Sequence, residues 1–502
     1  MKPVMVLLAA AAGVVVVAGA AQASAATIKV TTTKDQFGSQ PKKCSLREAI
    51  QAANTDARFG GCPRGKGADR IVLGKGTYRL TRAGTGESQN ANGDLNPASP
   101  MTITGKGPNA TIIDGNGAAI HEPVFSVASG RAKFAAMSIR NGLAPGDGAD
   151  GGGAIRHTSP GKLTLDRMRL VHNATDGTGG AVVVSNAATD LTVTRSQFVE
   201  NTAARYGGAL HVQDARNVTI RNSVFAGNVS QNDRAGVSIY DAEGRTVIAR
   251  TRITGNISVD GWMGGLYVDS NGGATLSKVT VAGNKAADRA GGIYLSQTQT
   301  VIRDSTISGN VAFGLAGGIM ADGGSTTLIN STVSGNVLTA PNGNGGGVYA
   351  QGSVSIRSST IAYNRAAFGA GIYEASAVSY KNSIVARNYS PIAYTRDCES
   401  PAPSASLGHN LFGDDTCDHD GPGDIALGTS AAPADPKLGV LARNGGPTPT
   451  HALMPGSPAI DKGQGCPKRD QRGHERKGRC DIGAFELGAK PPKAKRRKGR
   501  KK

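Results

Sequence analysis

An asparagine returns nine times in the middle of this sequence, at nearly equal intervals and within the same short pattern. Successive members are 24 to 28 residues apart. An apolar residue stands three positions before each one, an apolar residue or once a tyrosine stands eight positions before, and one or two glycines follow eight of the nine. The members are Asn173, Asn201, Asn228, Asn256, Asn284, Asn310, Asn336, Asn364 and Asn388. A period of this length is typical of a solenoid, in which structural repeats stack on one another.

Each repeat contains at least two short segments in which apolar and polar residues alternate, separated by turn-forming residues. Such alternation predicts β-strands, and a unit of about 27 residues with two or three strands predicts one rung of a parallel β-helix. No window has the sustained 3.6-residue periodicity of helical repeats, and β-propeller blades are longer, at about 40 residues. The 71 glycines and the aromatic content of 4% also favour narrow rungs. The predicted fold is all-β: a single-stranded parallel β-helix of about a dozen rungs.

The stacking of rungs gives the recurring asparagine a structural role. Identical positions of successive rungs lie above one another, about 4.8 Å apart. A carboxamide carries both donors and acceptors, so a column of asparagines can pass hydrogen bonds along the axis. We therefore expect the nine asparagines to form a ladder. A second column is expected from the hydroxyl residue five positions earlier in seven repeats: Ser196, Ser223, Thr251, Ser305, Ser331, Ser359 and Ser383.

Segments of different composition flank the repeats. The N-terminal apolar run with small residues behind it is typical of a cleaved signal peptide, with an uncleaved membrane anchor as the alternative. In "CSLREAIQAAN", Ser45 and Glu48 have the spacing of a capping box, so a short helix is expected to close the N-terminal end of the solenoid. The predicted organisation is a signal peptide at residues 1–25, an N-terminal cap at 26–70, the β-helix at 71–390, an irregular disulfide-bearing C-terminal cap at 391–488 and a basic tail at 489–502.

The six cysteines lie outside the nine asparagine repeats and fall into three local pairs. Six cysteines allow 15 connectivities, but short loops favour neighbours, and export to an oxidising compartment makes disulfides expected. A zinc site is the competing interpretation, which no CxxC spacing or paired histidine supports. The expected disulfides are Cys44–Cys62, Cys398–Cys417 and Cys466–Cys480.

The formal net charge of +19 is unevenly distributed. The last fourteen residues carry six lysines and three arginines without an acidic residue, which is typical of a disordered tail. Such a tail can simply aid solubility, or it can bind polyanions such as anionic cell-wall polymers. No aromatic residue interrupts it, so stacking on nucleic-acid bases is not indicated.

Both ends and the repeats resemble families of exported bacterial proteins. "CSLREAI" resembles the signature of CSLREA-domain proteins, and "DPKLGVLARNGGPTPTHALMPGSPAIDKG" with "RCDIGAFE" is similar to the choice-of-anchor Q region. The repeats resemble polymorphic outer membrane protein repeats and the right-handed parallel β-helices of the pectin lyase-like superfamily. The resemblance implies a right-handed β-helix that is secreted or exposed at the cell surface. Unlike in the anchored relatives, no apolar segment near the C-terminus is long enough to span a membrane, so no membrane-spanning segment is expected in the mature chain. It implies no single activity, because such folds carry many.

The variable turn after each ladder asparagine supplies the catalytic candidates. Carboxylates can serve as general acid and base in glycoside hydrolysis, and arginines can neutralise a uronate. If the rungs are in register, these residues form one stripe along the solenoid. Aspartate and arginine are also common turn residues, and neighbouring opposite charges can simply pair. The candidates are Asp176, Arg205, Asp233, Arg234, Asp260, Asp288 and Arg289.

Aromatic residues supply the binding candidates. Tyr206 and Trp262 fall in the same turns as the charged stripe. A second stripe stands two residues after the last turn glycine, where alternation points it away from the core; its members are Tyr267, Tyr294, Tyr349 and Tyr373, with Met320 in the gap. These rings can stack on sugars, or on one another beneath a loop. The segment "GDGADGGG" has oxygen ligands for Ca²⁺ but no regular motif, so no cofactor is expected to be required.

The function that these features favour is binding of extracellular polysaccharide or of an anionic cell-surface polymer, as in an adhesin. A polysaccharide lyase or glycoside hydrolase is the first alternative, and a structural component of a surface layer is the second. The localisation expected in all three cases is extracellular or at the cell surface.

Overall fold

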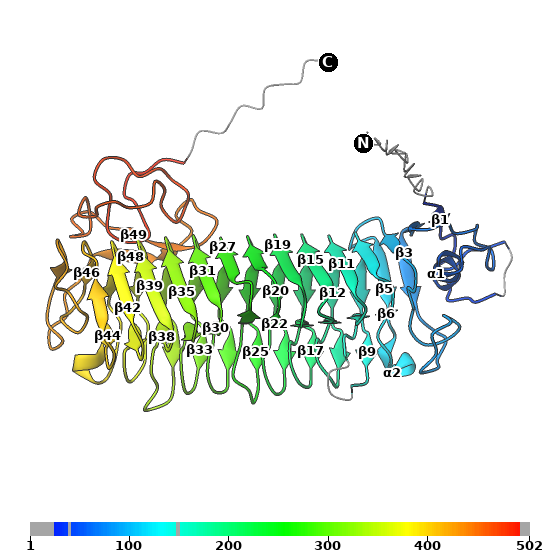
Figure 1. The fold of residues 1–502 in the computed structure, drawn as a ribbon, viewed down its shortest axis with the longest axis horizontal. Coiled ribbons are helices and arrows are strands. Elements are labelled where there is room, and N and C mark those ends of the chain that lie inside the picture. Colours follow the sequence, from blue (N-terminus) through cyan, green and yellow to red (C-terminus); the bar gives the residue numbers. More distant parts are fainter. Residues whose placement is uncertain (1–24, 39–41, 147–150, 492–502) are drawn as a thin grey trace, which may run out of the picture.

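A computed structural model describes residues 25–38, 42–146 and 151–491 of the chain. These residues form a parallel β-helix of about 12 turns, with a side domain over its C-terminal rungs (Figure 1). The fold class is therefore the predicted one. The expected signal peptide lies almost entirely outside the described residues, as does most of the expected basic tail. No helix in the described ranges is long and apolar enough to span a membrane.

Four parallel sheets run along the solenoid, and a complete rung visits them in the order A, B, C, D. Sheet A contains β1 (Thr27–Lys29), β2 (Asp69–Val72), β4 (Met101–Thr104), β7 (Arg131–Ala135), β11 (Gly161–Asp166), β15 (Thr189–Thr194), β19 (Asn217–Arg221), β23 (Thr246–Ala249), β27 (Ala274–Ser277), β31 (Gln299–Arg303), β35 (Ser325–Ile329), β39 (Ser353–Arg357), β42 (Val378–Lys381) and β45 (Ser404–Ser406). Sheet B contains β3 (Gly76–Arg79), β5 (Thr111–Asp114), β8 (Ser138–Arg140), β12 (Arg169–Val171), β16 (Gln197–Val199), β20 (Val224–Ala226), β24 (Arg252–Thr254), β28 (Thr280–Ala282), β32 (Thr306–Ser308), β36 (Thr332–Ser334), β40 (Thr360–Ala362), β43 (Ile384–Ala386), β46 (Leu411–Phe412) and β47 (Ile425–Ala426).

The other two sheets are shorter. Sheet C contains β9 (Leu143–Ala144), β13 (Ala174–Thr175), β17 (Thr202–Ala203), β21 (Val229–Ser230), β25 (Ile257–Ser258), β29 (Lys285–Ala286), β33 (Val311–Ala312) and β37 (Val337–Leu338). Sheet D contains β6 (Phe125–Val127), β10 (Ile155–His157), β14 (Val182–Ser185), β18 (Leu210–Gln213), β22 (Val237–Ala242), β26 (Leu266–Ser270), β30 (Ile293–Ser296), β34 (Ile319–Asp322), β38 (Val348–Ala350), β41 (Ile372–Glu374) and β44 (Cys398–Glu399). A central rung thus has four strands, more than the two or three expected, because the two-residue strands of sheet C are too short to show alternation.

The two apolar columns of the repeat fill the interior. The residue eight positions before each ladder asparagine points inward from sheet A, and the residue three positions before it points inward from sheet B. Leu276 and Val281 are one such pair, and both are fully buried. Each inward side chain packs on its counterparts in the rungs above and below, so the core is a stack of similar layers.

The recurring asparagines form a hydrogen-bonded ladder at the turn between sheets B and C. In each step, the Oδ1 atom of one asparagine accepts the backbone N–H and the side-chain N–H of the asparagine before it. Asn284 Oδ1 accepts from Asn256 N at 3.0 Å and from Asn256 Nδ2 at 2.8 Å. The ladder is longer than predicted, because Asp397 continues it by accepting from Asn388 N at 3.2 Å and from Asn388 Nδ2 at 2.9 Å.

The hydroxyl residues before the ladder form a second column for part of its length. Ser196 N donates to Ser223 Oγ at 3.2 Å, and Ser305 N donates to Ser331 Oγ at 3.3 Å. These bonds satisfy backbone groups in the turn between sheets A and B, where the chain changes direction and the strands cannot pair.

A helix closes the N-terminal end of the stack. Helix α1 (Leu46–Asn54) has a capping box in which Ser45 and Glu48 cap each other. Its apolar face is buried against the first rung, and Cys44 is bonded to Cys62 beside it. A second, four-residue helix, α2 (Gly117–Ile120), lies at a turn further along the chain.

The C-terminal region differs from the single cap that was expected at residues 391–488. Strands β44 to β47 continue the stack beyond residue 390, with a one-turn 3-10 helix, η1 (Ala393–Thr395), at the start of this part. Disulfide Cys398–Cys417 lies here. These rungs could not be recognised in the sequence, because their strands are short and interrupted by proline and cysteine.

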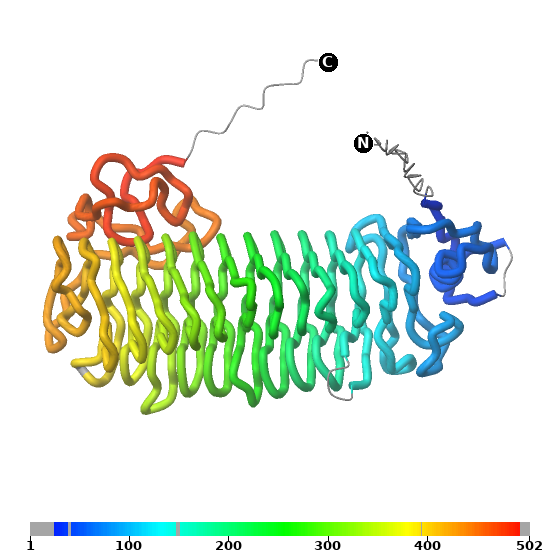
Figure 2. Tube along the Cα trace, viewed as in Figure 1, coloured from blue at the N-terminus to red at the C-terminus, as the bar shows by residue number. Residues whose placement is uncertain are grey.

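The last segment, residues 430–491, lies over the C-terminal rungs (Figure 2) and contacts the outer face of sheet B. It contains the antiparallel hairpin of β48 (Leu438–Ala442) and β49 (Thr450–Leu453), and disulfide Cys466–Cys480. Outward hydroxyls of sheet B receive it: Thr332 Oγ1 donates to Gln471 Oε1 at 2.7 Å, and Thr306 Oγ1 bonds to Pro449 O at 2.5 Å. We refer to this segment as the side domain.

One carboxylate, that of Glu374, lies inside the β-helix near its C-terminal end and is fully buried. Its oxygens accept hydrogen bonds from the Tyr380 hydroxyl and from Ser400 Oγ. Burial raises the pKa of this carboxyl from 4.5 to about 7, against the lowering effect of the Ser400 hydrogen bond.

Replacing Glu374 by glutamine is expected to stabilise the protein more at pH 8, relative to wild type, than at pH 4.5. Between pH 4.5 and about 7 the folded state binds the proton more tightly than the unfolded state, so wild-type stability is lost as the pH rises through this window. The displacement of the pKa corresponds to about 3 kcal/mol. The measurement is the difference in unfolding free energy between the two proteins at each pH, in which other titrating groups cancel. A difference that does not change with pH would contradict the prediction.

Candidate functional site

The turns between sheets C and D carry the predicted charged stripe, and they stack from rung to rung. Asp233 N donates to Arg205 O at 2.9 Å, and Arg289 N donates to Trp262 O at 3.1 Å. The predicted residues therefore occupy one edge of the solenoid. They do not all converge. Three of them, Asp176, Arg205 and Asp260, are exposed and separate. The other four form two pairs of adjacent opposite charges.

The paired members are Asp233 with Arg234 and Asp288 with Arg289. Their charged atoms are 3.5 Å and 3.7 Å apart, respectively. Asp233 Oδ1 also accepts the backbone N–H groups of Trp262 and Arg234, each at 2.9 Å. Burial raises the pKa of Asp233, and the nearby Arg234 charge opposes this. Asp233 thus holds two stacked turns together, and its position is that of a structural acceptor.

Arg234 is the centre of an aromatic cluster. Its guanidinium carbon lies 4.2 Å from the ring centre of Tyr267, 4.9 Å from that of Tyr240 and 5.0 Å from that of Tyr206. Such positions allow cation–π attraction. The side chain keeps 16% of its surface exposed, and its guanidinium donates no hydrogen bond within the described part of the chain. Its outer N–H groups therefore remain available to a ligand.

Trp262 and Arg289 repeat this arrangement one rung further on. The Arg289 guanidinium lies 4.1 Å from the Trp262 ring centre, and the indole is 45% exposed. Because Asp233 bonds to the backbone of both Arg234 and Trp262, the two clusters are neighbours. We call Tyr206, Arg234, Tyr240, Trp262 and Arg289 the arginine–aromatic platform.

The predicted tyrosine stripe is a column on the outer face of sheet D. Tyr267, Tyr294, Met320, Tyr349 and Tyr373 pair in register from strand to strand. Tyr267 and Tyr294 are buried with Met263 and Ala290 of the stacked turns, so they pack beneath a loop, which was the alternative to sugar stacking. Tyr349 and Tyr373 are half-buried and stacked, with ring centres 5.3 Å apart.

The hydroxyls of the buried tyrosines remain protonated at neutral pH. Burial raises the pKa of Tyr267 to about 12, and burial together with the hydrogen-bonded Asp322 carboxylate raises that of Tyr294 further. These residues therefore support the platform from below, and only Tyr206, Tyr240 and Trp262 present large exposed ring surfaces there.

Sequence reasoning missed Tyr240 and the carboxylates beside it. Tyr240 stands four residues after the turn glycine and shares the outward face of Ser238, and a bulge in β22 follows it. Alternation alone would have found it. Burial and the neighbouring Asp241 carboxylate raise the pKa of Asp269, whose Oδ2 lies 3.4 Å from the Tyr267 hydroxyl.

No group of three or more metal-ligating side chains occurs in the described ranges. The acidic residues of "GDGADGGG", Asp147 and Asp150, lie outside those ranges, so the Ca²⁺ expectation at this loop stays a prediction.

The stacked rungs and the asparagine ladder define a right-handed parallel β-helix protein. A family model described as "right handed beta helix region" matches residues 180–337. A search of solved structures finds the crystal structure of pectate lyase Pel9A, at 14% sequence identity and a TM-score of 0.35, covering 92% of this chain and 97% of that one. A comparison with curated proteins gives no match. The family model describes a fold, and neither comparison assigns a substrate or an activity.

Proposed function

We propose that this protein is an extracellular β-helix that binds polysaccharide through the arginine–aromatic platform. The observation that carries the proposal is Arg234, whose guanidinium is held among three tyrosine rings while no described residue accepts a hydrogen bond from it. Arginine N–H groups suit hydroxyl and carboxylate oxygens, and exposed ring faces suit the flat side of a sugar. The three disulfides support an oxidising, extracellular location.

Within the charged stripe, the arrangement of the carboxylates favours binding over catalysis. Asp233, the least exposed carboxylate of the charged stripe, uses Oδ1 for backbone hydrogen bonds, and Asp288 lies beside Arg289. Glycosidases instead need two carboxyl groups that flank one bond, about 5 to 10 Å apart. The proposal includes the binding of a cell-surface or extracellular polymer and a role as an adhesin. It also includes a relationship to CSLREA-domain and choice-of-anchor Q proteins.

Replacing Arg234 by glutamine is expected to weaken polysaccharide binding at least tenfold. The chain has one tryptophan, and it lies in the platform, so titration with oligosaccharides can be followed by the emission of Trp262 without a label. Glutamine keeps much of the side-chain length but loses the charge and the fork of donors. Arg357→Gln, at an exposed position on sheet A, is the matched control and should leave the titration unchanged.

An activity assay on the same protein tests the enzymatic alternative. Ultraviolet absorbance of unsaturated uronides and release of reducing ends are measured across acidic and neutral polysaccharides, with and without Ca²⁺. Turnover that Asp260→Asn abolishes without lowering the melting temperature would replace the binding proposal with an enzymatic one. Equal affinities of Arg234→Gln and Arg357→Gln for every polymer would remove the platform from the proposal.

A further inference from the structure

A column of left-handed turn residues runs along the edge between sheets A and B. Each member directly follows a strand of sheet A and donates its backbone N–H to a carbonyl of the next rung; Arg195 N, for example, bonds to Arg221 O at 3.0 Å. Their φ angles lie between 46° and 56°. Seven consecutive members are Arg167, Arg195, Asn222, Arg250, Lys278, Asp304 and Asn330, and Ala136, Ser358 and Asn382 extend the column at its two ends.

The left-handed backbone conformation does not explain why four members of this column are basic residues. A left-handed conformation costs about 1–2 kcal/mol for most residues, and glycine, asparagine and aspartate adopt it most readily. At the corresponding turn between sheets B and C, five consecutive rungs use glycine: Gly227, Gly255, Gly283, Gly309 and Gly335, with φ of 60° to 64°. The rungs on either side of these five have His172, Glu200, Tyr363 and Arg387 at this position, with φ of 53° to 63°. The column between sheets A and B instead has a basic residue in four of five consecutive rungs. Strained residues of this kind are typical of functional positions.

The basic side chains of this edge extend into solvent. Arg167 and Arg195 are 57% and 60% exposed, and they hold Asp166 between them at 3.4 Å and 2.6 Å. The strands on either side add further exposed or half-exposed arginines. We define the basic track as Arg167, Arg195, Arg221, Arg250, Arg252, Lys278 and Arg303. The carboxylates of Asp166, Asp304 and Asp470 lie beside it.

The side domain turns the end of the track into a groove. A cavity of 390 Å³ lies between Lys278 and Arg303 on the rungs and Lys468 and Arg469 on the side domain, and Asp304 and Asp470 also line it. Arg469 pairs with Glu475 at 3.7 Å. Asn330 lies at its base: Nδ2 donates to Arg469 O at 2.8 Å, whereas the buried Oδ1 has no partner in the described structure. Asn330 Oδ1 is therefore a preformed acceptor for a ligand hydroxyl.

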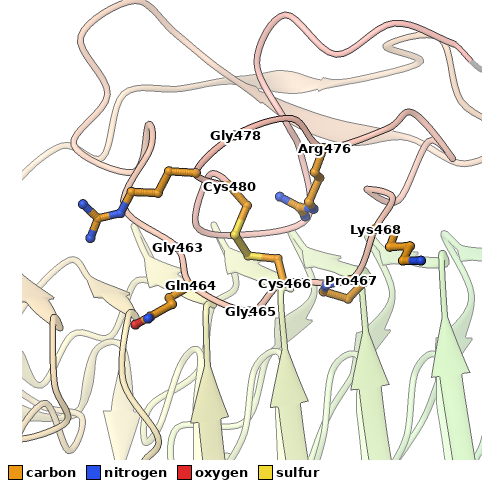
Figure 3. A pocket seen from close by; sticks show the side chains of 10 residues that line it. Gly463, Gln464, Gly465, Cys466, Pro467, Lys468, Arg476, Gly478 and Cys480 are labelled. Carbon is orange, nitrogen blue, oxygen red and sulfur yellow. A yellow bond between two sulfur atoms is a disulfide. The ribbon is translucent and has the colours of Figure 1, made fainter.

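The groove continues into a second cavity, of 550 Å³, at the Cys466–Cys480 disulfide. Pro467 and Lys468 line both cavities. Figure 3 shows Lys468 and Arg476 on loops above the strands, with the disulfide between the two loops. Arg476 is committed to Glu486 at 2.9 Å, whereas Lys468 and Arg479 have no ion-pair partner among the described residues. The cationic surface thus extends from the rungs onto the side domain.

We propose that the basic track binds a linear acidic glycopolymer, charged through carboxylate or phosphate groups, laid along the axis of the solenoid into this groove. Rungs repeat about every 4.8 Å, so the track offers about one cation for each 4.8 Å of its length. This spacing suits a polymer that carries one charge on each repeating unit of similar length. Guanidinium groups bind both kinds of anion through paired hydrogen bonds. The track has no aromatic member on which nucleic-acid bases could stack, which favours a glycopolymer over single-stranded nucleic acid. This surface is separate from the platform on sheet D, and the proposal does not depend on it.

The test measures binding of fluorescently labelled polygalacturonate and of a glycerol-phosphate polymer to the full chain by anisotropy. The track variant is Arg195→Gln, Arg250→Gln, Lys278→Gln. The control variant is Arg245→Gln, Lys285→Gln, Arg365→Gln, which removes the same charges from exposed positions away from the track. The C-terminal basic segment is present in both. For at least one polymer, the track variant should bind at least tenfold more weakly, and its plot of log affinity against log salt should be shallower by about two.

Two further measurements test the proposal: the stability and affinity of a glycine variant, and the binding of DNA. Arg195→Gly, Arg250→Gly, Lys278→Gly removes the backbone strain together with the charge, and should melt no lower than wild type while it still loses affinity. Retained affinity in this glycine variant, or equal loss in the track and control variants, would overturn the proposal. Tighter binding of single-stranded or duplex DNA, lost in the track variant, would assign the surface to nucleic acid instead.

Discussion

Replacing Asn284 by alanine is expected to lower the free energy of unfolding by about 3–5 kcal/mol, because it leaves buried polar groups without partners at about 1–3 kcal/mol each. Asn284 is fully buried in the middle of the ladder. Its Oδ1 accepts the backbone N–H of Asn256, and its Nδ2 donates to Ile253 O, both at 3.0 Å. Alanine can replace neither bond.

The effect should be largest in the rungs next to the substitution. Stability in a solenoid is the sum of the rungs and of the contacts between neighbours, so a broken step uncouples the two halves of the stack. Urea denaturation followed by circular dichroism measures the loss, and a second transition would show the uncoupling. Asn232→Ala, in an exposed turn of the same helix, is the control and should change stability by less than about 0.5 kcal/mol. Equal effects of the two substitutions would show that the ladder is not a principal source of stability.

Replacing Arg47 by methionine is expected to destabilise the N-terminal cap by about 3–5 kcal/mol, as is typical when one partner of a buried ion pair is removed. The Arg47 side chain is fully buried and pairs with Asp35 at 2.7 Å. Its guanidinium also donates to four backbone carbonyls in one loop, those of Asn90, Asn92, Gly93 and Asp94. One side chain thus fastens helix α1 to two segments that are distant in sequence.

Hydrogen exchange is the appropriate readout for Arg47→Met, since the cap can open while the central rungs remain folded. Exchange should accelerate in residues 26–96 and remain slow in the central repeats. Arg58→Met, an exposed arginine shortly after the same helix, is the control. Asp35→Asn combined with Arg47→Met should cost less than the sum of the single changes, because the two side chains share one interaction. Additive costs, or unchanged exchange in the cap, would contradict the role given to Arg47.

The period of the repeat was sufficient to predict the β-helix, its inward columns and its ladder. Each rung contacts mainly the rungs before and after it, so the rule that places a residue recurs at every step of the chain. Asn284 could be assigned to the ladder because its relation to Asn256 and Asn310 is a relation of spacing. The capping box of Ser45 and Glu48 was predictable for the same reason, since three residues separate its partners. The local disulfide pairs were also expected from short separations along the chain.

The arginine–aromatic platform was only partly predictable. The charged turns and the tyrosine stripe were each visible in the sequence, but not that Arg234 would lie over Tyr206, Tyr240 and Tyr267. That meeting depends on how far each variable turn folds back over sheet D, and a repeat period does not specify the path of a turn. The path of each turn also decides which charged residues pair with a sequence neighbour and which face a ligand.

The sequence by itself determined the architecture of this protein, because hydrophobic periodicity, turn residues and stacked amides act between neighbouring rungs. Only the tertiary structure decided where the side domain lies, since Thr332 and Gln471, which bond to each other, are 139 residues apart. The same holds for Arg47 and the loop carbonyls it binds, more than 40 residues further along the chain. Contacts of this kind depend on the shapes of two surfaces that exist only after the rungs have formed, and no local pattern in the chain encodes them.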